Sequence, residues 1–239
     1  MRPLTYSVSS VCWTPYDLRC KFTRVSTGTA GTEIRLALTR ERIIEAAVDF
    51  IDIHGLDALS MRKLGTALDV KGMSLYNHIA NKSELLDGVV ESLWAETEAA
   101  APALPDWREG IRSLAHAVRA TVRRHPNAAP LIFSQQLMPQ AALRLVRTHV
   151  AELVAAGFDR STAYDLLRTI WSYAFGSAFA EITWDPGNPG CAVDARQLLR
   201  PGTPDELAAV ADVFCGQSNA EAQFELGLDL MLRGIEQPS

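Results

Sequence analysis

From Thr39 onward, the apolar residues of the chain recur at the spacing of helices. Five of them follow an i, i+1, i+4, i+7, i+8 pattern: Ile43, Ile44, Ala47, Phe50 and Ile51. This pattern places them on one face of an amphipathic helix. The Thr39 hydroxyl can cap the first turn of that helix, and Gly55 can end it. No segment shows the alternation that is typical of a strand. The sequence therefore predicts an all-α chain.

Capping and breaking residues divide the rest of the chain into further helices with short connections. Ser60 can cap a short helix, and Asn81 with Glu84 forms a capping box that opens a longer one. Pro139 is expected in the first turn of its helix. The expected helices cover about residues 60–68, 73–79, 81–98, 106–124, 127–134, 139–157, 159–182, a segment that begins near 203, and 219–235. A break at 101–105 and a long loop at 184–203 interrupt them.

Residues 1–32 have neither a helical nor an alternating period and carry a net charge of +3. We interpret them as a flexible N-terminal arm. Two alternatives are a basic arm that reaches a DNA groove and a translation start placed too early.

Composition excludes several classes of protein. No apolar run reaches the ~18 residues of a membrane span, and no signal peptide is evident. The four cysteines lack zinc spacing, which indicates reduced thiols in a cytoplasmic protein without a metal or cofactor. The net charge of −5 argues at first against nucleic acid as a partner.

Residues 60–79 have the length and order of a helix-turn-helix. Leu75 and Ile79 are expected to face a core with Leu64 and Val70. Polar side chains then face outward, with cations beside them: Ser74, Tyr76, Asn77 and His78, flanked by Lys71 and Lys82. Such groups can reach base edges and phosphates. Charge placement on this face therefore outweighs the acidic total. The alternative is a helical hairpin inside an ordinary bundle.

Three segments carry a family resemblance: residues 38–44, 55–64 and 68–86. Their most specific part is Leu75-Tyr76-Asn77-His78-Ile79-Ala80-Asn81-Lys82. The chain resembles the tetracycline-repressor (TetR) family there, and residues 221–236 look like the last helix of the tetracycline-repressor subclass. The resemblance implies a repressor that binds a palindromic double-stranded DNA operator as a homodimer. It also implies a helix-turn-helix DNA-binding domain at 33–80 and an effector-binding and dimerisation domain at 81–239.

The resemblance also assigns roles at the DNA. Arg62 stands where the subclass has a base-reading arginine, and Ser60, Tyr76 and Lys82 match phosphate-contacting positions. The recognition segment comprises Lys71, Gly72, Met73, Ser74, Asn77 and His78. Asn77 replaces the aromatic residue that is usual in the subclass, so we expect a different operator sequence.

Two helices are expected to form the dimer. The segment 159–182 is apolar almost all round, with small residues that allow close approach, Ala174 and Ala178 among them. The last helix has one apolar stripe at Phe224, Leu228, Met231 and Ile235 and a second at Leu226 and Leu230. We assign the small residues and the first stripe to dimerisation. The alternative is one large monomeric core.

The expected effector is a small molecule whose identity the sequence does not give. Its site is predicted from apolar walls with a few polar groups: His116, Phe133, Gln135, Gln136, Met138, His149, Trp171, Phe175 and Phe179. The alternative for each is an ordinary core position. The subclass holds metal-chelated tetracycline through histidines and an acidic residue, where this chain has Ile132, Ser172 and Ala180. We therefore predict that Mg-tetracycline is not the effector.

Two other functions remain as alternatives. A ligand-responsive activator would share every feature above. An all-helical enzyme would need a catalytic or metal motif, and none of the five histidines has such spacing.

Overall fold

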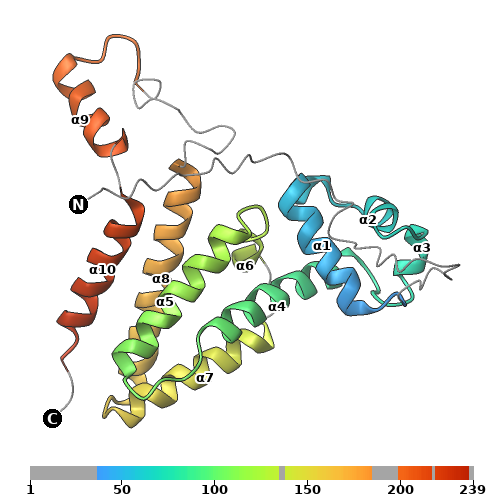
Figure 1. Cartoon of the computed structure of the whole chain (residues 1–239), viewed down its shortest axis with the longest axis horizontal. Coiled ribbons are helices and arrows are strands. Elements are labelled where there is room, and N and C mark those ends of the chain that lie inside the picture. Colours follow the sequence, from blue (N-terminus) through green and yellow to red (C-terminus); the bar gives the residue numbers. More distant parts are fainter. Residues whose placement is uncertain (1–36, 135–137, 185–198, 217–218, 237–239) are drawn as a thin grey trace, which may run out of the picture. The chain divides into compact units, whose positions relative to one another are not determined.

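The computed structural model describes residues 37–134, 138–184, 199–216 and 219–236. The chain divides into two units, Met1–Ala37 and Leu38–Ser239, and the second contains all of the described helices (Figure 1). Residues 1–36, Gln135 and Gln136 lie outside the described residues. The described part consists of helices and turns without a strand, which confirms the all-α prediction.

Two long helices, with three short elements between them, make up the start of the second unit. Helix α1 spans Arg40–His54, a 3-10 turn η1 spans Leu56–Ala58, α2 spans Met61–Ala67 and α3 spans Gly72–Leu75. The long helix α4, Lys82–Ala100, packs against α1 and continues toward the rest of the unit.

The remaining helices are α5 (Trp107–Arg124), α6 (Leu131–Ser134), α7 (Gln140–Ala155), α8 (Arg160–Trp184), α9 (Asp205–Gly216) and α10 (Ala220–Gly234). Helix α5 packs on α8, α4 and α7, and α10 lies along α8. The apolar faces of these helices, α9 excepted, form a continuous core with those of α1 to α4. No helix in the described part of the chain is long and apolar enough to cross a membrane.

The predicted caps start the helices as expected. Thr39 Oγ1 accepts from the Arg42 backbone N–H at 3.3 Å, and Asn81 Oδ1 accepts from the Glu84 N–H at 2.9 Å. The Glu84 carboxylate in turn accepts from the Ala80 N–H at 2.7 Å, one residue earlier than in the usual capping box. Local side-chain chemistry therefore determines where these helices begin.

Several helix boundaries differ from the sequence-based expectation, and α6 begins at Leu131 instead of residue 127. Helix α3 ends at Leu75 instead of residue 79, and tight turns carry the chain from Tyr76 to Ile79. Pro139 precedes α7 as its N-cap and is not in its first turn. Because proline has no side-chain acceptor, the carboxylate of Glu91 on α4 takes that role. It accepts from the N–H groups of Gln140 and Ala141 at 2.7 and 2.9 Å.

Candidate DNA interface and ligand site

Helices α2 and α3 cross at very short range because two glycines meet there. A Cβ on Gly65 would lie only 2.8 Å from both Cα and N of Gly72, and a Cβ on Gly72 would lie 3.1 Å from Arg62 Cα. Ser60 caps α2, its Oγ accepting from the Lys63 N–H at 3.3 Å. Sequence reasoning did not identify Gly65. Its presence inside a short helix was the available signal, because glycine there weakens a helix unless close packing requires it.

The inner side of this helix pair is closed to solvent. Leu64 and Leu75 are fully buried and Ile79 is 1 % exposed, while Val70 packs at their edge. The outer side is open: Met73 is 75 % and Tyr76 44 % exposed. Asn77 and His78 are also exposed, whereas Gly72 and Ser74 are half-buried. The predicted recognition segment is thus presented to solvent on one face.

The charge of this part of the chain is positive. Residues 60–82 contain four Lys and Arg residues and one carboxylate, Asp69. Arg62 and Lys71 are exposed, and their side chains form no hydrogen bond or ion pair with the described residues. Lys82 is held by the Leu59 carbonyl, to which its Nζ donates at 2.9 Å. Two cationic side chains without a partner in the described part, Arg62 and Lys71, and one that is hydrogen-bonded, Lys82, therefore lie near the outer face. Phosphate binding requires such positive charge.

Five aromatic rings from three helices meet in the second half of the unit, and we call them the aromatic cluster. They are Trp94 on α4, Phe133 on α6, and Trp171, Phe175 and Phe179 on α8. Ring centroids lie 4.9 Å apart for Trp94–Trp171, 6.0 Å for Trp94–Phe175, 5.0 Å for Phe133–Phe175 and 5.8 Å for Phe133–Phe179. The sequence prediction named every member except Trp94.

The aromatic cluster has one buried, unpaired donor and an exposed edge. The Nε1–H of Trp171 is buried and has no acceptor among the described residues. Phe133 is 63 % exposed and Met138, a further predicted ligand residue, is 65 % exposed. An apolar aromatic surface with one unpaired donor and an open side is suited to a small molecule that carries a hydrogen-bond acceptor.

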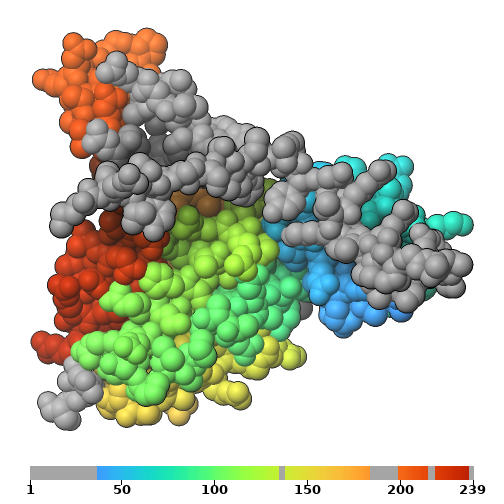
Figure 2. Space-filling view, viewed as in Figure 1, coloured from blue at the N-terminus to red at the C-terminus, as the bar shows by residue number. Residues whose placement is uncertain are grey.

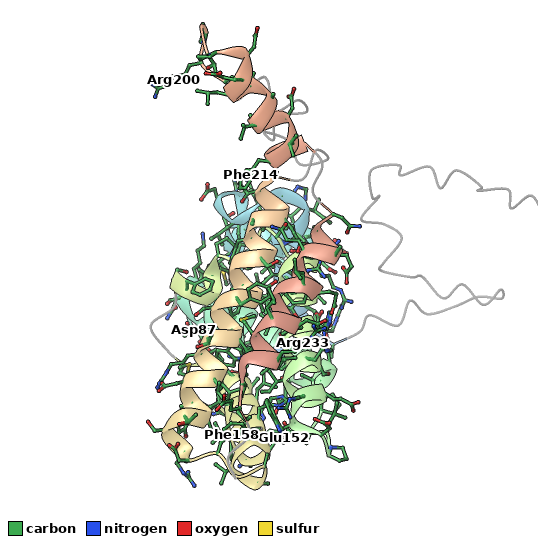
Figure 3. The ribbon with its side chains drawn as sticks, turned by 90° about the vertical axis from the view of Figure 1, so that its left-hand side faces the viewer. Asp87, Glu152, Phe158, Arg200, Phe214 and Arg233 are labelled. Carbon is green, nitrogen blue, oxygen red and sulfur yellow. The ribbon has the colours of Figure 1, made fainter. Side chains whose placement is uncertain are left out.

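The two histidines predicted to line the ligand site make their contacts elsewhere. His116 on α5 faces α10: its Nε2 lies 2.8 Å from Glu225 Oε1 and its ring contacts Phe224. His149 on α7 is fully buried, with Nδ1 2.6 Å from Glu152 Oε2. Figure 3 shows Glu152 at the same end of the helices as Phe158, which packs on Trp107 at the start of α5. Neither histidine has a ring contact or hydrogen bond to the aromatic cluster in the described part.

The residues predicted to form the dimer differ in their burial within the single chain. Ala174, Ala178, Phe224 and Leu228 have no exposed surface within the single chain, and Met231 and Ile235 are half-buried against its core. A side chain without accessible surface has none to contribute to a second chain. The stripe of α10 that is open consists of Leu226 and Leu230, which are 62 % and 63 % exposed.

Helix α10 is held to its own chain by a row of ion pairs that sequence reasoning missed. Arg112 on α5 pairs with Glu225 at 2.7 Å and with Asp229. Arg119, only 4 % exposed, pairs with Glu181 of α8 at 2.7 Å and with Glu221 at 2.6 Å. Figure 2 shows α10 in red beside α5 in green. The available signal for these ion pairs was the spacing of Arg112 and Arg119, which lie seven residues apart and so on one face of α5.

The same row contains the one group of possible metal ligands found among the described residues. Ligand atoms of His116, Glu221 and Glu225 lie within 4.8 Å of one another. Both carboxylates already bind guanidinium groups, those of Arg119 and Arg112. A cation would have to displace these arginines, so the arrangement is better explained as ion pairing.

Comparison with known proteins agrees with both parts of this description. Residues 43–89 match the tetR family of bacterial regulatory proteins, and residues 101–238 match the tetracyclin repressor-like C-terminal domain. An HTH-type transcriptional regulator of Saccharopolyspora erythraea is 29 % identical over 199 residues, which cover 83 % of this chain and 84 % of that protein.

Solved structures show the same relationship. A possible TetR family transcriptional regulator from Streptomyces coelicolor A3(2) has a TM-score of 0.68 and 32 % identity, over 82 % of this chain and 97 % of that one. The Streptomyces coelicolor TetR family protein ActR, in complex with actinorhodin, has a TM-score of 0.66 and 26 % identity, over 83 % and 97 %. The chain therefore belongs to the tetR family of bacterial regulatory proteins: it is a DNA-binding transcriptional repressor that acts as a homodimer and responds to a small molecule.

Proposed function

We propose that Arg62, Lys71 and the outer face of α3 read the operator, and that a small molecule bound at the aromatic cluster releases the protein from it. The observation that carries the DNA assignment is the contrast between the two sides of α3. Leu75 is fully buried, whereas Met73 is 75 % exposed with free cations beside it. Ser60 and Lys82 serve to fix the protein on phosphates, and Arg62 supplies a two-bond contact to guanine.

The chemistry of the aromatic cluster supports a neutral, flat ligand with an aromatic ring system. Ring faces favour stacking, and the buried Trp171 N–H favours a carbonyl or ether oxygen as its partner. The related ActR also binds a small molecule, since its structure was solved in complex with actinorhodin. His116 and His149 remain predictions of the sequence, with contacts that favour a structural role.

Helix α4 offers a direct connection between the two sites. It carries Lys82 in its first turn and Trp94 twelve residues later, about 18 Å along the axis at the usual rise per residue. A ligand that binds better when α4 is displaced lowers operator affinity by the ratio of its affinities for the two states. We place this regulator in the cytoplasm with its DNA and assign it no catalytic role, since the family is one of transcriptional regulators.

The proposal is tested by selecting duplex DNA from a random library with the full-length protein. The selected duplexes should share a palindrome, and anisotropy titration should show affinity that falls with salt. Flat aromatic compounds should then release the labelled duplex from the wild type, while Trp171→Phe, which lacks the N–H, should need higher concentrations. Release by none of these compounds, or equal release of the variant, would count against the ligand assignment.

Mg-tetracycline itself should not be the effector. Ile132 packs against the core, Ser172 is exposed with its hydroxyl on the Arg168 carbonyl, and Ala180 is exposed. None of these side chains supplies a preferred ligand for a metal chelate. Isothermal titration with tetracycline should show no tight binding that depends on Mg²⁺, and observing such binding would refute this prediction.

A further inference from the structure

His125, directly after α5, joins three segments of the chain. His125 is 9 % exposed. Nδ1 lies 2.6 Å from Oδ2 of Asp52 on α1, and Nε2 lies 3.0 Å from Oε2 of Glu96 on α4. Asn127 strengthens the junction, its Nδ2 donating to the Asp52 carbonyl at 2.9 Å. One imidazole therefore bridges the helix that supports the DNA-reading face and the helix that reaches the aromatic cluster.

Both partners of this imidazole are carboxylates, which accept hydrogen bonds when ionised. A neutral imidazole has one N–H and can donate to only one of them, whereas the imidazolium donates to both. Burial lowers the pKa of His125, but the hydrogen bonds and charges of Asp52 and then Glu96 outweigh it, so that its pKa is raised from the ordinary value. The geometry and the charges both favour the protonated bridge.

The two carboxylates differ in what they retain when the proton is lost. Glu96 keeps Arg124, whose Nη1 lies 2.5 Å from Glu96 Oε1. Asp52 Oδ1 is buried without a partner among the described residues, so the Asp52 carboxylate depends on His125. Deprotonation leaves the imidazole with one N–H, so it loses the hydrogen bond to one of the two carboxylates and no longer joins α1 to α4.

The position of the bridge gives it a functional consequence. Glu96 follows Trp94, a member of the aromatic cluster, by two residues on α4, while Asp52 lies on the helix that packs behind α2. We propose that protonated His125 is a latch that ties α1 to α4, and that its deprotonation changes operator affinity. The DNA part of this inference rests on the proposed function, whereas the latch itself does not.

The latch is tested first without DNA. In an NMR titration of the full-length protein, the His125 C2–H resonance, assigned by its loss in His125→Gln, should titrate above the ordinary value of about 6.5. Asp52→Asn and Glu96→Gln should each lower that midpoint. Titration of His125 at or below the ordinary value, or midpoints unaffected by either variant, would overturn the latch.

Hydrogen exchange provides a second arm that needs no DNA. Between pH 6 and pH 9, corrected for intrinsic exchange rates, protection of residues 40–54 should fall in the wild type by about tenfold, of the order of common coupling effects. In His125→Gln, which is neutral at every pH, protection should be low throughout. Parallel profiles for the two proteins would mean that His125 has a structural role only.

The regulatory consequence is tested by anisotropy with a fluorescein-labelled duplex selected as described above. Wild-type affinity should change about fivefold or more between pH 6 and pH 9 beyond the change in His125→Gln, and the two proteins should agree at the high pH. His78, which faces the DNA, is common to both and cancels in the comparison. Circular dichroism verifies folding, and Glu96→Gln is the second variant.

Equal pH profiles refute the regulatory role. Absence of DNA binding refutes the proposed function while the NMR and exchange results still decide the latch.

Discussion

We expect Arg62 to determine how well the protein discriminates between DNA sequences, because it is the arginine of α2 whose side chain is exposed and unpaired beside the recognition segment. Arg62→Ala removes a two-bond contact to guanine and should weaken operator binding by about 5- to 150-fold, or about 1–3 kcal/mol. It should also relax selectivity at one base pair of each half-site. Anisotropy against a series of operators with single base-pair changes measures both effects.

Lys82→Ala, at a position assigned to phosphate contact, is the matched control. It should weaken binding to every sequence alike and reduce the salt dependence by about one counterion, because a lysine on phosphate carries no sequence information. If Arg62→Ala showed the same uniform loss, the assignment of Arg62 to base reading would be wrong.

At the scale of residues, the sequence predicted which side chains are buried better than it predicted which side chains contact each other. Leu64, Leu75 and Ile79 could be assigned to the core because their spacing alone places them on one helix face. His125 and Glu96 are far apart in the sequence, as are His116 and Glu225, and no local pattern indicates that they meet. The same limit applies to α10, since spacing identifies two stripes but not which one the chain itself covers.

The α2–α3 crossing depends on the two glycines that meet there. Gly65→Ala places a Cβ against the backbone of Gly72, which cannot move without shifting α3. We expect a loss of about 1–3 kcal/mol in the free energy of unfolding, a cost common for overpacking, together with weaker operator binding. Urea unfolding at fixed protein concentration measures the first effect. Gly234→Ala, where no atom lies within 4 Å, is the control and should not lower stability.

The attachment of α10 to the rest of the chain depends on Arg119. Arg119→Ala leaves Glu181, 12 % exposed at its side chain, without its main partner. Breaking such a buried pair should cost about 3 kcal/mol, seen as a lower midpoint of thermal unfolding at fixed protein concentration. Arg168→Ala, which breaks the exposed pair with Asp165, should leave the midpoint unchanged. Equal effects of the two variants would contradict this account of α10.

At the scale of elements, helix starts were predictable where their caps are local. Thr39, Ser60 and Asn81 each cap the helix that follows them. The start of α7 depends instead on Glu91, a residue of another helix, and this tertiary contact has no counterpart in the local sequence.

At the scale of the whole molecule, the homodimer should depend on the open stripe of α10. Leu230 is 63 % exposed and, with Leu226, forms the apolar surface that the single chain leaves uncovered on this helix. Leu230→Glu places a charge in the interface, so it should shift the protein toward monomers and weaken operator binding with it. Sedimentation at several concentrations measures the shift. A dimer as stable as the wild type would show that α10 contributes little.

The net charge of −5 is also a property of the whole molecule, and by itself it does not indicate a DNA-binding protein. Positive charge is concentrated in residues 60–82, so specific contacts there must provide much of the affinity. The most direct test is therefore a titration of the full-length protein with a selected palindromic duplex, with one half-site of it, and with unrelated DNA of equal length. The account predicts two chains per palindrome, much weaker binding to the half-site, and an affinity that falls steeply with salt. Equal affinity for all three duplexes, or binding by a monomer, would contradict it.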